Sequence, residues 1–75
     1  MERRKNQHVI RCRTGWAVRG EGNNKNTAVV RFKLEAIFIA RRIAINQKSE
    51  LLIHNKGGEI VLRDSYGNDP FPNER

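Results

Sequence analysis

Hydrophobic residues recur with helical spacing in one stretch of the chain, residues 34–48, with the sequence LEAIFIARRIAINQK. At about 100° per residue, part of its side chains fall on one side of a helix, at the spacing of a stripe that faces a core. These residues are Ala36, Ile37, Ala40, Ile43, Ala44 and Gln47. The small alanines would let the helix lie close to a sheet. We therefore predict a single helix over this stretch.

The same helix carries a second apolar stripe on its opposite side. Large, aligned apolar side chains on a surface are more often an interface than an accident, and so short a chain gains from additional burial. We predict a homodimer, or docking on another protein, through this stripe. The alternative is that residues 20–32 or the tail at 70–72 cover it within one chain. The stripe consists of Leu34, Phe38, Arg41 and Ile45.

Short runs that alternate between apolar and polar residues flank the helix and predict β-strands. Before the helix, Arg13-Thr14-Gly15 interrupts the alternation and predicts a hairpin turn; after it, the glycines of residues 55–58 do the same. A loop rich in Gly and Asn covers residues 20–26. The predicted strands cover residues 8–12, 16–19, 27–32, 50–54 and 59–63.

The phase of the alternation predicts which strand residues face the helix. We place Ile10 and Cys12 on the helix side of the first strand, and Val9 and Arg11 on the opposite side. The predicted fold is α+β: an antiparallel sheet of four to five strands with one helix packed on one face, in the order strand, strand, short strand, helix, strand, strand. The predicted core comprises Ile10, Trp16, Val18, Ala36, Ile37, Ala40, Ile43, Ala44, Leu51, Ile53, Ile60 and Leu62.

The chain length of 75 residues allows one domain with a small core. We divide the chain into a flexible basic arm (1–7), the α+β domain (8–64) and an extended, proline-containing tail (65–75). The longest apolar run, residues 36–40, is too short to cross a bilayer, and no apolar segment of a secretory signal follows the charged N-terminus. A single cysteine, Cys12, excludes an intramolecular disulfide. We expect a cytoplasmic protein without membrane contact.

The formal net charge of +7 is unevenly distributed. Residues 1–33 carry nine Lys and Arg against two acidic residues, whereas residues 34–75 carry six of each sign. Such a bias suggests contact with a polyanion, most often nucleic acid, although a solvated basic surface has the same composition. With the strand phase above, the uncovered face of the sheet is basic and includes His54. We predict non-sequence-specific contact with nucleic-acid phosphates through this face and the N-terminal arm. The predicted contacts are Arg3, Arg4, Arg11, Arg13, Arg19 and Arg63.

A competing hypothesis assigns the charge no specific role. In it the chain is a protein-binding module, or a small regulator or inhibitor of a larger complex, that acts through the apolar outer face of the helix. Aromatic residues of the kind that stack on bases are absent from the predicted uncovered face, which disfavours base-specific recognition.

Catalytic chemistry has little support in the sequence. His8 and His54, with Asp64 and Ser65, are the residues from which a hydrolytic or RNA-cleaving group would be built. Their spacing does not require such a group, and no local pair has the spacing that preorganises metal ligands. We therefore expect no enzymatic activity, no metal, no cofactor and no small-molecule substrate.

Several short segments together carry a resemblance to a known family. They are His8-Val9-Ile10, Gly15-Trp16-Ala17-Val18, Glu35-Ala36-Ile37, Ala40-Arg41, Ile43-Ala44, Glu50-Leu51-Leu52-Ile53-His54, Gly58-x-Ile60 and Arg63-Asp64-Ser65-Tyr66-Gly67-Asn68-Asp69-Pro70. In them the chain resembles the small bacterial family catalogued as domain of unknown function 2188. The resemblance implies a short bacterial protein of hairpin, helix, hairpin design. It supplies a fold and carries no known activity over to this chain. Family members usually have Thr or Ser where this chain has Phe32, and polar residues where it has Phe38 and Ile45.

Overall fold

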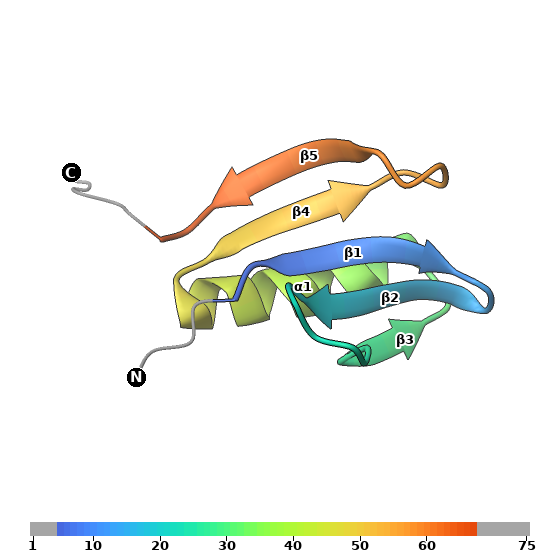
Figure 1. Cartoon of the computed structure of the whole chain (residues 1–75), viewed down its shortest axis with the longest axis horizontal. Helices are drawn as coiled ribbons and strands as arrows, with labels where there is room; N and C mark the ends of the chain where they lie inside the picture. Colours follow the sequence, from blue (N-terminus) through green and yellow to red (C-terminus); the bar gives the residue numbers. More distant parts are fainter. Residues whose placement is uncertain (1–4, 68–75) are drawn as a thin grey trace.

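The structure, a computed structural model, describes residues 5–67 as a five-stranded sheet with one helix on one face (Figure 1). The fold is therefore α+β, as predicted. The elements follow one another in the predicted order of two strands, a short strand, a helix and two strands. They are β1 (Gln7–Cys12), β2 (Gly15–Gly20), β3 (Ala28–Val30), α1 (Lys33–Gln47), β4 (Glu50–His54) and β5 (Ile60–Ser65).

The strand order in the sheet is β3-β2-β1-β4-β5, and the sheet is mixed instead of purely antiparallel. β1 and β4 pair in parallel, whereas the other three pairings are antiparallel. The parallel pairing follows from the connection: α1 returns the chain, so β4 runs in the direction of β3, and β1 shares that direction because both β1 and β3 are antiparallel to β2. Only three residue pairs, Gln7–Leu51, His8–Leu52 and Val9–Ile53, join the two halves of the sheet.

Gly15 allows the β1–β2 hairpin to approach the start of the helix. Its φ angle of 154° is one that side chains other than hydrogen rarely allow. A Cβ at this position would collide with the carbonyl oxygen of Val30 and come within 3.0 Å of the Cα of Arg31. The turn predicted at residues 13–15 is therefore confirmed, and it lies against the β3–α1 junction.

α1 begins and ends one residue before the predicted bounds. Phe32 stands at the N-cap and has no side-chain acceptor; instead the Glu35 carboxylate accepts the Phe32 backbone N–H at 3.5 Å. At the other end Lys48 adopts a left-handed conformation with φ 53°, and the Ser49 N–H donates to the Ala44 carbonyl at 2.9 Å. This is the C-terminal arrangement in which glycine usually occupies the left-handed position.

Three alanines of α1 form its contact with the sheet. Ala36, Ala40 and Ala44 are fully buried, so the helix backbone lies close to the strands. The strand residues of this core are Val9, Trp16, Val18, Leu51 and Ile53, and half-buried Ile37 and Ile43 pack against it. The predicted positions of Trp16, the alanines and the β4 residues in the core are confirmed.

The predicted phase of β1 is wrong. Val9 is fully buried against α1, while Ile10 and Cys12 lie half-buried on the opposite face. Val9 pairs with Val18 on one side and Ile53 on the other, and the two neighbours hold it on the helix side. Alternation could not decide this because Val9 and Ile10 are both apolar and β1 is a central strand.

β5 does not contribute to the core as predicted. Ile60 and Leu62 retain exposed fractions of 46% and 43%. Among the described residues, α1 contacts β1, β2, β3 and β4 but not β5, which lies beyond the helix at one edge of the sheet (Figure 1). The apolar pattern of residues 59–63 correctly predicts a strand. It does not indicate which strands of the sheet the helix covers.

The helix is also too short and too polar to cross a membrane. This holds for every helix in the part of the chain that the structure describes.

Candidate functional site

The structure divides the predicted phosphate-binding arginines between two surfaces. Arg19 and Arg63 lie on the open face of the sheet, since Arg19 pairs with His8 and Arg63 with Leu52 across adjacent strands. Arg11 does not, because the phase of β1 is reversed: it lies opposite Trp16 on the helix side. Arg13 is exposed in the turn between β1 and β2, and residues 3 and 4 lie outside the described part of the chain.

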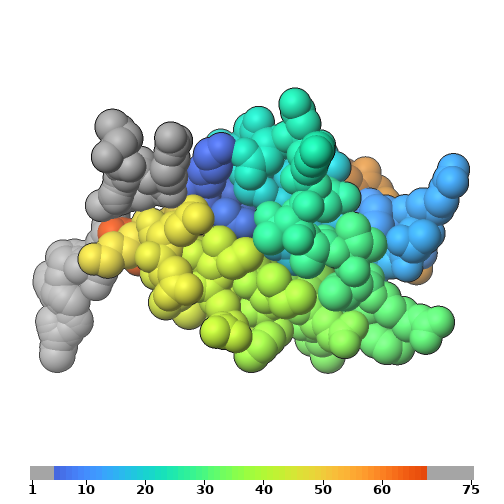
Figure 2. Space-filling view, turned by 90° about the horizontal axis from the view of Figure 1, so that it is seen from below, coloured from blue at the N-terminus to red at the C-terminus, as the bar shows by residue number. Residues whose placement is uncertain are grey.

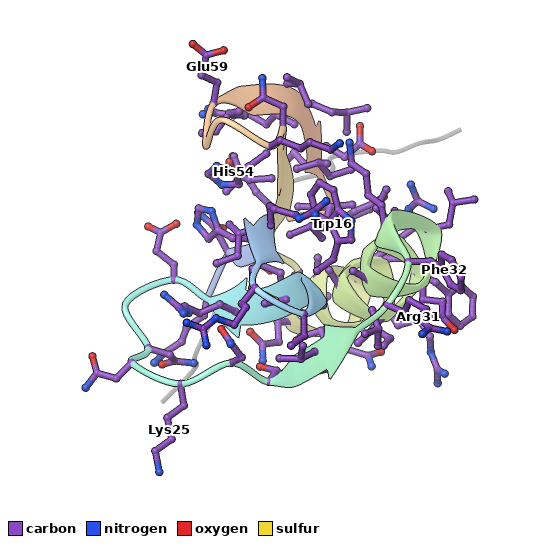
Figure 3. The ribbon with its side chains drawn as sticks, turned by 90° about the vertical axis from the view of Figure 1, so that its right-hand side faces the viewer. Trp16, Lys25, Arg31, Phe32, His54 and Glu59 are labelled. Carbon is purple, nitrogen blue, oxygen red and sulfur yellow. The ribbon has the colours of Figure 1, made fainter. Side chains whose placement is uncertain are left out.

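Arg11 instead belongs to a cluster of cations at one end of the molecule. The Arg11 guanidinium and the Lys33 ammonium both lie over the Trp16 ring, 5.6 Å and 5.1 Å from its centre. The backbone of Arg31 lies directly against Gly15, which follows Arg13 by two residues in the hairpin turn. We call these four residues, Arg11, Arg13, Arg31 and Lys33, the basic end; Figure 3 views the molecule from this side, with Arg31 and Phe32 beside the start of the helix.

The basic end forms no ion pair within the described structure. Between residues 5 and 67 the one ion pair joins His8 to Glu21, so no carboxylate of that range pairs with the basic end. Like charges held together repel one another, and an anionic partner would relieve this repulsion. Phe32, with an exposed fraction of 60%, adds an accessible aromatic ring beside the Arg31 guanidinium, 6.0 Å from the ring centre. The sequence signal for this cluster was the excess charge before residue 34; its assembly required the contact between the hairpin turn and the helix start.

A second group lies on the open face, where the structure brings His8 and His54 together. Their Nδ1 and Nε2 atoms are 2.9 Å apart. The other ring nitrogen of His8 lies 3.0 Å from the Glu21 carboxylate, and that of His54 lies 3.1 Å from the Gly58 carbonyl oxygen. Asp64, which the sequence analysis grouped with them, pairs with Leu51 and so lies on the helix side.

The hydrogen bonds at Glu21 change its acidity. The bond from His8, followed by a weaker one from the Asn6 amide at 3.3 Å, lowers the pKa of Glu21 below its usual range. The positive charge of Arg63 acts in the same direction. Within the described residues, no three His, Cys, Asp or Glu side chains surround a common metal position.

The outer face of α1 is the third candidate surface. Leu34, Phe38 and Ile45 retain exposed fractions of 78%, 61% and 49%, so residues 20–32 do not cover the stripe. The tail at 70–72, the other predicted cover, lies outside the described residues. Figure 2 shows this side of the molecule, with α1 running across the front from green to yellow.

Phe38 protrudes between two shallow hollows on this surface. The first is lined by Val30, Leu34, Glu35, Phe38 and Ile39, and the second by Phe38, Ile39, Arg42, Ile43 and Asn46. The Arg42 guanidinium lies 5.9 Å from the centre of the Phe38 ring. Arg41, predicted to lie in the stripe, donates a hydrogen bond from Nε to the Tyr66 hydroxyl at 3.2 Å.

These features define a small domain in which one helix covers part of a mixed sheet and whose surface includes a basic and an apolar patch. The chain belongs to the family described as an uncharacterized protein conserved in bacteria (DUF2188), which matches residues 7–66 and thus all five strands and the helix. This confirms the resemblance found in the sequence. The chain is similar to the uncharacterized protein YdaT of Bacillus subtilis (strain 168), with 36% identity over 63 residues. The match covers 84% of this chain and 42% of YdaT, so the chain spans less than half the length of that relative. No solved structure matches the chain significantly.

Proposed function

We propose that this is a non-enzymatic nucleic-acid-binding protein of the bacterial cytoplasm that contacts phosphates through the basic end. The observation that carries the proposal is the placement of four cations on two neighbouring segments, residues 11–13 and 31–33, which meet at Gly15 and at the Trp16 ring; no ion-pair partner of these cations is present among the described residues. Phosphates of a nucleic-acid backbone are closely spaced anions that such a cluster neutralises together. The proposed set keeps Arg11 and Arg13 from the sequence prediction, adds Arg31 and Lys33, and leaves Arg19 and Arg63 as a separate pair on the open face.

The neighbouring aromatic ring indicates the kind of nucleic acid. Phe32 is exposed beside Arg31, and a single-stranded chain offers unpaired bases that stack on such a ring while its phosphates contact the cations. Because the proposed cation contacts are with phosphates, and an aromatic ring stacks on any base, we expect little sequence preference.

Salt titration of oligonucleotide binding tests this proposal. Four phosphate contacts predict that log K falls against log salt with a slope of about −3 for a single strand and about −4 for a duplex. The variant Arg13→Gln/Arg31→Gln should lose affinity and about half of that slope. The matched control, Lys25→Gln/Lys48→Gln, removes the same charge from exposed positions away from the basic end. Equal losses in both variants, or no salt response, would contradict a specific role for the basic end.

A second candidate function is supported by the outer face of α1. We propose that this face binds a second copy of the chain. The surface carries both a protruding aromatic side chain, Phe38, and an adjoining hollow lined by Val30 and Leu34. In a two-fold symmetric dimer each copy offers the same patch, so the Phe38 of each copy can occupy the hollow of the other.

A further inference from the structure

His8 and His54 are the central members of a hydrogen-bonded chain that begins at Glu21 and ends at the Gly58 carbonyl (His54 is labelled in Figure 3). Both ends of this chain are obligate acceptors, because neither a carboxylate nor a carbonyl oxygen can donate a proton. The outer ring nitrogens must therefore be the donors: Nε2 of His8 toward Glu21, and Nδ1 of His54 toward Gly58. The two acceptors therefore determine which nitrogen of each ring carries a proton in the outer hydrogen bonds.

The inner contact then needs one more proton. Each neutral ring has already placed its single N–H at the outer position, which leaves lone pairs on His8 Nδ1 and His54 Nε2 facing each other at 2.9 Å. That distance suits an N–H···N hydrogen bond but is repulsive for two lone pairs. Three protons on the two rings satisfy every bond, and the pair then carries one positive charge next to the Glu21 carboxylate.

The pair lies at the junction between the two halves of the sheet. β1 belongs to the β1–β2 hairpin and β4 to the β4–β5 hairpin, and only three residue pairs join them directly. The histidine bond links these strands through side chains, Glu21 adds the loop after β2, and Gly58 adds the β4–β5 turn. The charged residues on the same face are Glu21, Arg19 of β2, Arg63 of β5 and Glu50 of β4.

We propose that His8 and His54 form a proton-dependent clasp, in which one proton shared between His8 Nδ1 and His54 Nε2 closes the junction between β1 and β4. Loss of that proton leaves facing lone pairs, so the rings separate. Gain of a further proton fills both inner nitrogens with N–H groups and removes the acceptor, so the rings separate again. Since imidazole changes charge closer to neutral pH than other side chains do, the clasp responds to modest changes of pH.

The clasp has a distinctive signature in the positions of the ring protons, because the three hydrogen bonds fix which nitrogens carry them. Imidazole nitrogen resonances, followed between about pH 4 and 9, should show an intermediate state with His8 Nε2 and His54 Nδ1 protonated and a third proton between the inner nitrogens. In this state the amides of β4 and β5 should exchange about fivefold more slowly, after correction for intrinsic rates, than above or below it, as loss of one hydrogen bond implies.

Two single variants isolate the effect of the clasp from other titrating groups. His8→Gln and His54→Gln each remove one member and retain Glu21, so each should lose the maximum in amide protection while the variant stays folded. Glu21→Gln should lower the maximum, because a glutamine amide can donate as well as accept and therefore no longer requires the N–H of His8 to be on Nε2. Maxima that persist in both histidine variants would overturn the proposal.

A metal ion is the alternative occupant that the experiment must separate. Facing imidazole nitrogens also bind Zn²⁺, at about 2.0–2.1 Å from each nitrogen. The titration is therefore repeated with a chelator and with added Zn²⁺. A junction that is protected only with Zn²⁺, and shows no third ring proton with the chelator, would assign the site to a metal ion and refute the shared proton.

Discussion

Lys48 has a left-handed backbone conformation, which residues with a Cβ rarely adopt. It is the one residue other than glycine with positive φ in the described structure, and it ends α1. The left-handed conformation of Lys48 turns the chain from α1 into β4, the strand that pairs with β1. The family resemblance and the local pattern gave no sign of this strain, because lysine is an ordinary helix-forming residue.

Replacing Lys48 by glycine should stabilise the fold. We expect Lys48→Gly to raise the free energy of unfolding by about 0.5–1 kcal/mol, since glycine adopts positive φ without the steric cost of a Cβ, partly offset by its greater freedom in the unfolded chain. Urea denaturation measures the change. Lys25→Gly, in an exposed loop position without positive φ, should be neutral or slightly destabilising. The same gain in both variants would contradict this explanation.

Glu21 should make folding sensitive to acid. Its hydrogen bonds with His8 and Asn6 lower its pKa in the folded state. The unfolded chain therefore binds the proton more readily, and the contribution of this carboxylate to stability, present above the unfolded pKa, is lost as pH falls through the folded value. Between about pH 6 and 3, the thermal midpoint of Glu21→Gln should fall less than that of the wild type. Glu59→Gln, at an exposed turn, should follow the wild type; a shared response would rule out the specific role of Glu21.

At the scale of the element, α1 depends on small residues to reach the sheet. Ala36, Ala40 and Ala44 are fully buried, while larger apolar side chains of the same helix remain exposed on its outer face. Whether a side chain of α1 is buried therefore depends on the side of the helix on which it lies, and not on its size. The exposed Leu34 and Phe38 contribute little to the core of one chain.

Enlarging the middle alanine should disrupt this contact. We expect Ala40→Leu to cost about 1–3 kcal/mol of stability, because the added atoms push the helix away from the strands. Denaturation followed by Trp16 fluorescence measures both the loss and the change around the buried indole. Asn46→Leu, the same residue introduced at an exposed helix position, should change stability by less than about 0.5 kcal/mol. Tolerance of leucine at position 40 would show that the helix is not closely packed.

For the whole molecule, two apolar surfaces compete as sites of association. One is the outer face of α1; the other is β5, whose residues Ile60, Val61 and Leu62 are exposed at the sheet edge. Both surfaces lie outside the core, and the described chain covers neither of them. The hollow beside Phe38 is the feature that favours the helix face.

Sedimentation of charge-bearing variants distinguishes these surfaces. The wild type should sediment as a dimer, and Phe38→Glu/Ile45→Glu as a folded monomer, because the carboxylates cannot be buried in the interface without a large cost. The matched variant Val61→Glu/Leu62→Glu places the same charges on β5 and should remain dimeric. A monomeric wild type, or dissociation by the β5 variant alone, would exclude the helix face.

The elements and their order follow from local patterns in the sequence alone. The helix was found because its apolar positions repeat with the helical period over four turns, and the hairpin turns because Gly15 and the glycines near residue 58 interrupt alternating runs. Trp16 was placed correctly because it shares its phase with Val18, and both face the helix. In each case the decisive information lay within a short segment of the chain.

The faces on which these elements meet depend, in contrast, on contacts between distant segments. Val9 and Ile10 are both apolar, so the side of β1 that meets α1 depends on its two neighbouring strands and not on its own pattern. That choice moved Arg11 onto Trp16 beside Lys33, and the parallel pairing of β1 with β4 brought His8 to His54. Both candidate sites therefore join residues distant in sequence, through pairings that local periodicity cannot specify because each strand alone is compatible with several partners.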